Sequence, residues 1–348
     1  MPNVLVRLSD IAAALAVIFE PKIIPQFNRS VVLAQLLPYE VGTAAQVNWD
    51  AEFGTENVDT SVADGADIVD FDDDTPVKAS LLYATAQQSF KVTGKARAGA
   101  AITGNPAQLE DLFGEKLMGA ATRLISGINR DLYTGDGSAD HLWGLYPAGV
   151  KAIGATGNYA GIDRNTYPRW AGVVRANGGN ARPVTLQLMR EMRQAIYESC
   201  GQSTDLIICS PTQHTKFGQL LGDGRHFIQD VYMRGQKIVL DPGYQALMFD
   251  GIPVIQDVAC PNGIQIWINT NFVRLRQMPD AADIVNGSPG IMRLQGTPEM
   301  QFGEQMTGFY ARINPLAKLG DHIKMQLILY PAIQVKRPNA QGVLADLA

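Results

Sequence analysis

The chain has 348 residues and a mass of 37.7 kDa, enough for two ordinary domains or for one domain with long excursions. Hydrophobic residues make up 46% of the sequence, so the chain can bury a core and general disorder is excluded. Only 18% of the residues are charged, and glycine (34) and proline (19) are frequent. This composition indicates that much of the surface is covered by something other than water.

The formal charge of −5 is unevenly distributed along the chain. Residues 50–74 contain ten acidic residues and neither lysine nor arginine, so this window carries −10 and the remaining chain +5. A nucleic-acid-binding domain normally shows the opposite bias, a clustered basic face. The charge pattern therefore argues against sequence-specific DNA binding.

The cysteines and the N-terminal apolar run also limit the class of protein. Cys200, Cys209 and Cys260 show no Cys-x-x-Cys spacing, which argues against a disulfide scaffold, a zinc site or a redox pair and favours a reducing site of synthesis. The apolar run 11–19 is about half a membrane span and is not followed by a small-residue cleavage site. It predicts the buried face of a helix that is capped near Ser9, without export or membrane insertion.

The first β pattern covers residues 46–53, where apolar side chains alternate with polar ones as in a half-buried strand. The apolar side chains are Val47, Trp49, Ala51 and Phe53. A second extended stretch covers 80–96, and the acidic stretch 54–76 separates the two. We interpret 46–98 as a long two-stranded excursion with an acidic tip. Because an isolated two-stranded ribbon is only marginally stable in water, it needs a surface to lie on.

The clearest helix signal follows at Asn105, a good N-cap, with Pro106 at the first helical position and Gln108 as capping partner. Apolar residues then recur at helical spacing up to Thr134: Leu109, Leu112, Phe113, Leu117, Ala120, Ala121, Leu124, Ile128 and Leu132. The spacing predicts a helix of about 28 residues and about 40 Å.

The remaining chain predicts helices mixed with short strands. A helix, a strand and a second helix are expected over 186–200, 205–210 and 211–221. Short strands separated by turns follow over 247–268. An apolar strand pair over 324–338 closes the pattern, with Pro331 at a bulge or an edge position.

Motifs that carry chemistry are few. The histidines His141, His214, His226 and His322 form no metal-binding pattern. Ser210 lies between a strand and a helix, but it lacks the flanking glycines of a nucleophile elbow, and a helix-capping role explains it. Loop 135–144 follows a helix instead of opening one, so it lacks a phosphate site, and Asp72–Asp74 is typical of a solvated loop tip. We predict no catalytic, cofactor-binding or metal-binding residue.

Five segments together resemble the major capsid protein of tailed bacteriophages, which has the Hong Kong 97-type fold. In chain order they are the helix ending in LYTGDGSADHLWGLYPAG, GIDRNTYPRW at 161–170, the helix–strand–helix at 185–221, LMFDGIPVIQDVACPNGIQIWINTNFVRLR at 247–276, and the closing PAIQVKRPNA at 331–340. Each segment is weak alone, but five in this order over residues 100–340 are specific.

The resemblance implies an α+β fold with five parts. They are an N-terminal arm (1–45), an extended β-hairpin loop (46–98), a peripheral domain with a long spine helix (99–150), an axial domain (151–300) and the closing strands of the peripheral domain (301–348). In this family the arm and the hairpin reach over neighbouring subunits. The hairpin face is therefore expected to pack against a neighbouring subunit and only weakly against its own chain. The candidate inter-subunit contact residues are Val47, Trp49, Phe53, Lys78 and Phe90.

The resemblance implies a major capsid protein that self-assembles into pentamers and hexamers and encloses double-stranded DNA in the virion. It also implies synthesis in the host cytoplasm, no membrane association, no enzymatic activity and no cofactor. Portal, scaffolding or decoration proteins are the expected partners; about 45 residues before the hairpin are too few for a fused scaffold. An encapsulin shell protein is the alternative within the same fold, and a soluble α/β hydrolytic enzyme is the alternative from another class.

Two further expectations concern contacts between copies. The acidic stretch 54–76 is expected on the shell exterior or against basic groups of another subunit, with Lys78, Lys91, Lys95 and Arg97 as candidates. Some family members also join subunits by an isopeptide bond between a lysine and an asparagine, with a glutamate as the base. Here Lys78 and either Asn314 or Asn339 could react, but no glutamate follows Glu304, so we expect no crosslink.

Overall fold

The structure is a computed structural model. It describes residues 31–42, 44–53, 64, 76–96, 98, 106–138, 141–146, 152–221, 230–233, 236–239, 247–278, 291–293, 310–316 and 320–348. The helix expected over 11–19 lies outside the described residues, as does the acidic stretch 54–76 except for Asp64 and Pro76.

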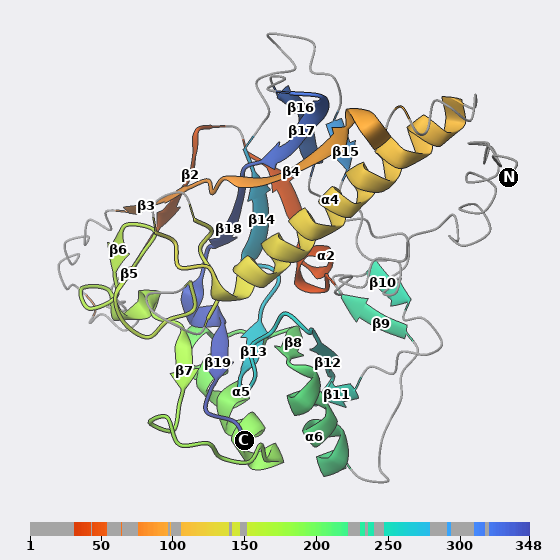
Figure 1. Cartoon of the computed structure of the whole chain (residues 1–348). Helices are drawn as coiled ribbons and strands as arrows, with labels where there is room; N and C mark the ends of the chain where they lie inside the picture. Colours follow the sequence, from red (N-terminus) through yellow and green to blue (C-terminus); the bar gives the residue numbers. More distant parts are fainter. Residues whose placement is uncertain are drawn as a thin grey trace, which may run out of the picture.

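The upper part of the molecule in Figure 1 consists of a long helix and an antiparallel sheet. Helix α4 (Pro106–Thr134) packs against β4 (Ala86–Thr93), the edge strand of a four-stranded sheet in the order β15–β16–β17–β4. The other strands are β15 (Ile291–Arg293), β16 (Tyr310–Leu316) and β17 (His322–Leu329).

Helix α4 begins at Pro106 and ends at Thr134, which confirms the helix predicted from the cap and the periodicity. Its 29 residues give a length of about 43 Å at about 1.5 Å per residue. Its described apolar stripe is buried: Ala120, Ala121, Leu124, Ile125, Ile128 and Leu132. Gly135 follows, and a Cβ atom there would lie 2.1 Å from the Leu142 carbonyl oxygen, so only glycine lets the next loop fold back onto the helix end.

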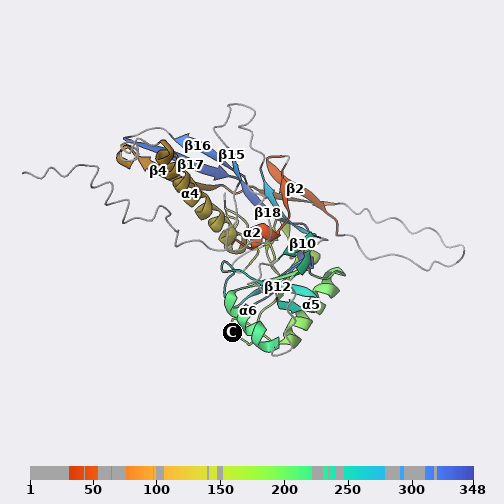
Figure 2. The same cartoon turned by 90° about the vertical axis from the view of Figure 1, so that its right-hand side faces the viewer.

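The lower part is a six-stranded mixed sheet covered by two helices (Figures 1 and 2). The strand order is β11 (Leu247–Phe249), β12 (Ile252–Gln256), β8 (Leu206–Cys209), β13 (Gln265–Ile268), β19 (Gly342–Leu344) and β7 (Val173–Arg175). Helices α5 (Leu186–Cys200) and α6 (Pro211–Leu221) share a core with one face of the sheet. The N-terminal segment, residues 31–37, and α4 share a core with the other face. The central strands β8 and β13 are fully buried because both faces of the sheet are covered, and Gln265 is the one polar residue in them.

Both helices of the lower part occupy the predicted residues. Helix α5 (Leu186–Cys200) is capped by Thr185, whose side chain accepts a hydrogen bond from the Leu188 N–H (3.2 Å). Helix α6 (Pro211–Leu221) is capped by the Ser210 hydroxyl, which accepts from the Gln213 N–H (3.4 Å). The position of Ser210 is therefore explained by capping, as the sequence predicts.

A three-stranded sheet lies between the two parts. It contains β1 (Tyr39–Val41), β14 (Val273–Gln277) and β18 (Pro331–Val335), with β14 in the centre. The short helix α2 (Leu33–Leu36) precedes β1 and packs on α4. The remaining elements are small: the pairs β2 (Gln46–Ala51) with β3 (Val77–Leu82), β5 (Asn158–Tyr159) with β6 (Ile162–Asp163) and β9 (Asp230–Met233) with β10 (Gln236–Val239), and the 3₁₀ turns η1 (Pro168–Trp170) and η3 (Pro338–Ala340).

Two strand expectations are wrong. The stretch 80–96 is not one strand returning from the hairpin: β3 pairs with β2, whereas β4 pairs with β17 in another sheet. The apolar closing stretch is not a pair either, because β17 and β18 also belong to different sheets. In both places a short connection redirects the chain, and the Ala84 N–H donates to the Pro331 carbonyl (2.9 Å) where the two connections meet. Pro331 does occupy an edge strand, as predicted.

The closing region also contributes to the lower part. Strand β19 pairs with β13 and β7 in the six-stranded sheet, away from β16 and β17. Residues 301–348, expected to close one domain, therefore supply strands to three different sheets.

Candidate inter-subunit surfaces

The five candidate contact residues lie on the hairpin β2–β3 and on β4. Val47 and Phe90 are buried, with 5% and 7% of their surface exposed, and Trp49 and Phe53 are half-buried. Lys78 is exposed, and it lies directly opposite Asp50 in the hairpin register. The hairpin therefore has an inner face turned toward its own chain and an outer, solvent-exposed face.

The expectation that the hairpin packs only weakly against its own chain is wrong. The Trp49 ring lies 6.5 Å from the Tyr159 ring and 6.3 Å from the Trp170 ring, measured between centroids. Phe53 stacks on Tyr167 at 4.6 Å and meets the edge of Trp170 at 5.8 Å. The rings are close because the segment 157–170 folds against the inner face of the hairpin. We call Tyr159, Tyr167 and Trp170 the aromatic joint.

A tight turn brings the aromatic joint to the hairpin. Ala160 and Gly161 both adopt positive φ angles, 54° and 83°, between the two-residue strands β5 and β6. Such angles at both central positions form a turn that favours glycine. The turn presents the Ala160 carbonyl to β3, where it accepts a hydrogen bond from the Ser80 N–H (2.9 Å).

Arg164 is buried beneath the aromatic joint. Its guanidinium donates to the carbonyls of Trp170 (3.2 Å), Thr156 (3.1 Å) and Ala152 (3.0 Å), and it lies 5.6 Å from the centroid of the Tyr159 ring. Burial lowers the pKa of Arg164 to about 10, which still leaves it charged at neutral pH. The cation thus connects backbone segments on both sides of the turn.

Removal of the guanidinium should destabilise the subunit strongly. Arg164→Ala leaves the carbonyls of Trp170, Thr156 and Ala152 without this donor, and each unpaired group that is buried costs about 1–3 kcal/mol. We expect the free energy of unfolding to fall by about 3 kcal/mol or more, measured by urea denaturation of unassembled subunits. The control is Arg169→Ala, an exposed arginine of the same segment. Equal losses in the two variants would contradict a bracing role for Arg164.

A buried carboxylate joins the two parts of the molecule. Asp257, directly after β12, is fully buried and accepts hydrogen bonds from Tyr133 Oη (2.8 Å) and Asn129 Nδ2 (3.0 Å) of α4. It also accepts from the N–H groups of Ala259 (2.8 Å) and Leu33 (3.4 Å). These partners are uncharged, so burial dominates and raises the pKa of Asp257 above its ordinary value.

Because the pKa of Asp257 is raised, the free energy of unfolding should depend on pH in a direction that can be predicted. Between the ordinary pKa of aspartate, about 4, and the higher pKa in the folded state, the native chain holds a proton that the unfolded chain has lost. This contribution to stability is present below pH 4 and is lost as the pH rises through the folded pKa. The free energy of unfolding of Asp257→Asn minus that of the wild type should therefore increase from pH 4 to pH 7, measured by urea denaturation. A difference that stays constant or falls would show that the hydrogen bonds outweigh burial.

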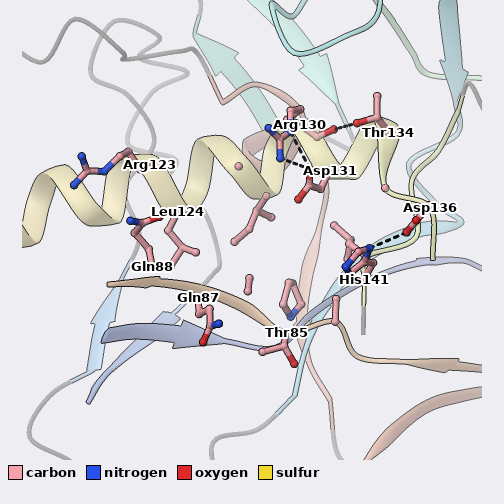
Figure 3. Close-up of a pocket in the computed structure, with 17 residues that line it drawn as sticks. Thr85, Gln87, Gln88, Arg123, Leu124, Arg130, Asp131, Thr134, Asp136 and His141 are labelled. Carbon is pink, nitrogen blue, oxygen red and sulfur yellow. Dashed lines mark hydrogen bonds and ion pairs between the residues drawn. The ribbon is translucent and has the colours of Figure 1, made fainter. Parts of the chain in front are cut away.

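An open hollow of about 620 Å³ lies between α4 and the start of β4 (Figure 3). Its walls carry Arg130 paired with Asp131 (2.9 Å) and His141 paired with Asp136 (3.1 Å). Donors from Ser138 lower the pKa of Asp136 to about 2, so this carboxylate is ionised at neutral pH. The hollow is a polar surface groove without an activated nucleophile among its lining residues.

Within the described ranges, no three His, Cys, Asp or Glu side chains lie together so that they could hold a metal ion. The same part of the chain contains no helix that is long and apolar enough to cross a membrane.

Comparison with solved structures identifies the fold. The capsid asymmetric unit of cyanophage A-1(L) matches with a TM-score of 0.73 and 20% identity, over 94% of this chain and 96% of that chain. The capsid of an empty GTA particle matches with a TM-score of 0.60 and 12% identity, over 97% and 98%. The SrpI encapsulin of Synechococcus elongatus PCC 7942 matches with a TM-score of 0.57 and 14% identity, over 97% and 95%. No family model and no curated protein match the sequence.

The similarity covers nearly the full length of each compared chain. The chain therefore has the Hong Kong 97-type fold of shell-forming proteins, which confirms the fold predicted from the sequence resemblance. At these levels of identity the similarity concerns the fold, and the function must be argued separately.

Proposed function

We propose that this chain is the major capsid protein of a tailed bacteriophage. The observation that carries the proposal is the match to the cyanophage capsid subunit over nearly the whole of both chains. The TM-score of 0.73 exceeds the 0.57 of the encapsulin, which favours the phage assignment over the encapsulin alternative. In this proposal the chain forms the pentamers and hexamers of an icosahedral shell that encloses double-stranded DNA, and portal, scaffolding or decoration proteins are its partners in the virion.

The described geometry supports roles for the parts of the chain. We assign α4 as the spine helix, the four-stranded sheet as the core of the peripheral domain, and the six-stranded sheet with α5 and α6 as the axial domain. Val31–Leu37, all buried against the body, form the base of the N-terminal arm. The hairpin β2–β3 is the root of the extended loop.

The outer face of the hairpin is the surface that the extended loop offers to another copy. Its alternate residues are exposed, whereas the inner residues pack on the same chain. The outer residues include Lys78 and Leu82, and 57% of the Leu82 side chain is exposed. Of the five candidate contacts, Lys78 therefore fits a neighbouring subunit best. Val47 and Phe90 have little surface left for it.

Assembly is the direct test of the proposal. The purified protein should form closed shells or capsomers visible by negative-stain electron microscopy and should elute far ahead of a 37.7 kDa monomer in size-exclusion chromatography. A compact monomer with hydrolytic turnover would contradict the proposal. Detection of the chain by immunogold labelling on DNA-filled, tailed particles supports the phage assignment, whereas DNA-free shells filled with an enzyme would identify an encapsulin.

The shell should contain no covalent links between subunits. In the crosslinking members of the family a glutamate near the last strands serves as the base, and here this stretch carries buried Leu327 and Leu329. The reaction needs a base that accepts the proton of the lysine, and this stretch supplies no carboxylate for that role. Boiling mature particles in SDS should release a single band near 37.7 kDa on a gel. A ladder of covalent pentamers and hexamers would show that another residue serves as the base.

A further inference from the structure

The aromatic joint contacts the hairpin at the end where Ala51 pairs with Val77, and we call this end the hairpin root. Phe53, two residues after the end of β2, is in ring contact with Tyr167 and Trp170, and the Ser80 N–H of β3 donates to the Ala160 carbonyl. Both strands of the hairpin are therefore attached, one through ring contacts and the other through a backbone hydrogen bond. A two-stranded ribbon attached at one strand only could rotate about that strand, and the second contact prevents this rotation.

The joint is fixed in turn to separate parts of the body. Tyr159 Oη accepts a hydrogen bond from the Val335 N–H (3.0 Å) of β18, and the Trp143 ring, from the loop after α4, meets Tyr159 edge-on at 5.6 Å. The Trp170 indole donates to the Tyr159 carbonyl (3.0 Å) and its ring stacks on the Tyr159 ring at 6.0 Å. The orientation of the hairpin root is thus coupled to the loop after α4 and to the three-stranded sheet that contains β18.

A small rotation of the hairpin root produces a larger displacement of any point that lies far from it. The sequence places 22 residues, 54–75, between Phe53 and Pro76, and half of that number of residues can span at most about 35 Å. A rotation of about 10° at the root moves a point at that distance by about 6 Å, more than the 4.0–4.5 Å or so within which side chains touch. Small changes at the root therefore decide whether a distant contact forms.

We propose that the aromatic joint sets the direction in which the hairpin leaves the subunit, and that Tyr167 and Trp170 are positioning residues for the contact between copies. This inference rests on the proposed shell function and assigns a role to the GIDRNTYPRW segment within it. The pair Phe53–Tyr167 is the best point for a test because both side chains are half-buried, so their loss leaves the central core intact.

The first measurement uses unassembled subunits. Spin labels are placed on Glu52→Cys, next to the hairpin root, and on Tyr197→Cys of α5, both exposed, in a Cys200→Ser background that removes the half-buried thiol. Electron–electron double resonance then gives the distribution of distances between hairpin and body. We expect one narrow distribution for the otherwise wild-type chain and at least a twofold broadening in Phe53→Ala and Tyr167→Ala.

Two further variants separate positioning from general destabilisation. Tyr167→Phe retains the stack on Phe53 and should restore the narrow distribution. Tyr330→Ala removes another half-buried aromatic side chain that is packed on the core and makes none of the ring contacts of the joint, and it should leave the distribution unchanged.

The second measurement is assembly of the same unlabelled variants. We expect Phe53→Ala and Tyr167→Ala to lower the yield of uniform particles at least tenfold in electron micrographs, with Tyr167→Phe and Tyr330→Ala near wild type. A narrow distribution in Phe53→Ala and Tyr167→Ala overturns the inference and leaves the shell function intact, and so do broadened distributions with normal particles. A wild-type chain that forms no particles overturns the proposed function itself, and the inference with it.

Discussion

The attachment of the hairpin to its own chain is the constraint on which the proposed assembly depends. Ring contacts from Trp49 and Phe53 occupy the inner face of the hairpin, so only its outer face and the stretch beyond it remain for another copy. This division explains how a ribbon that is marginal in isolation is stabilised before any partner arrives. It also separates the interactions that fold the subunit from those that join subunits.

Two buried ionisable side chains fix the relation between the parts of the molecule. Arg164 holds the segment under the hairpin through backbone carbonyls, and Asp257 holds α4 and the N-terminal segment to the end of β12. Three backbone carbonyls accept hydrogen bonds from Arg164, and uncharged side chains and N–H groups donate to Asp257. Such sites lose much stability when one partner is removed, because the remaining groups stay buried and unpaired. These contacts connect the hairpin, α4 and the six-stranded sheet within one chain.

Local signals in the sequence identified the helices but not the contacts between distant segments. The capping signals at Asn105 and Ser210 and the apolar periodicity of all three helices depend on a few neighbouring residues, so α4, α5 and α6 were predictable. The contact between the hairpin and the joint brings together rings more than 100 residues apart in the sequence, Trp49 and Trp170. No local pattern in the sequence encodes such a contact. The same reason explains the errors at β4 and β18, since local alternation shows that a strand exists but does not identify its partner. For Asp257 a signal was available: an acid directly follows the apolar strand IPVIQ, where a solvated carboxylate is not expected.

The path of the hairpin in an assembled particle depends on the fold, on the joint and on the proposed assembly together. A cryo-electron microscopy reconstruction at side-chain resolution tests it directly. We predict that Trp49 and Phe53 remain against Trp170 and Tyr167 of the same chain, while Lys78 and the residues beyond β2 contact another copy. A hairpin released from its own aromatic joint, with Trp49 inserted into a neighbouring subunit, would contradict it.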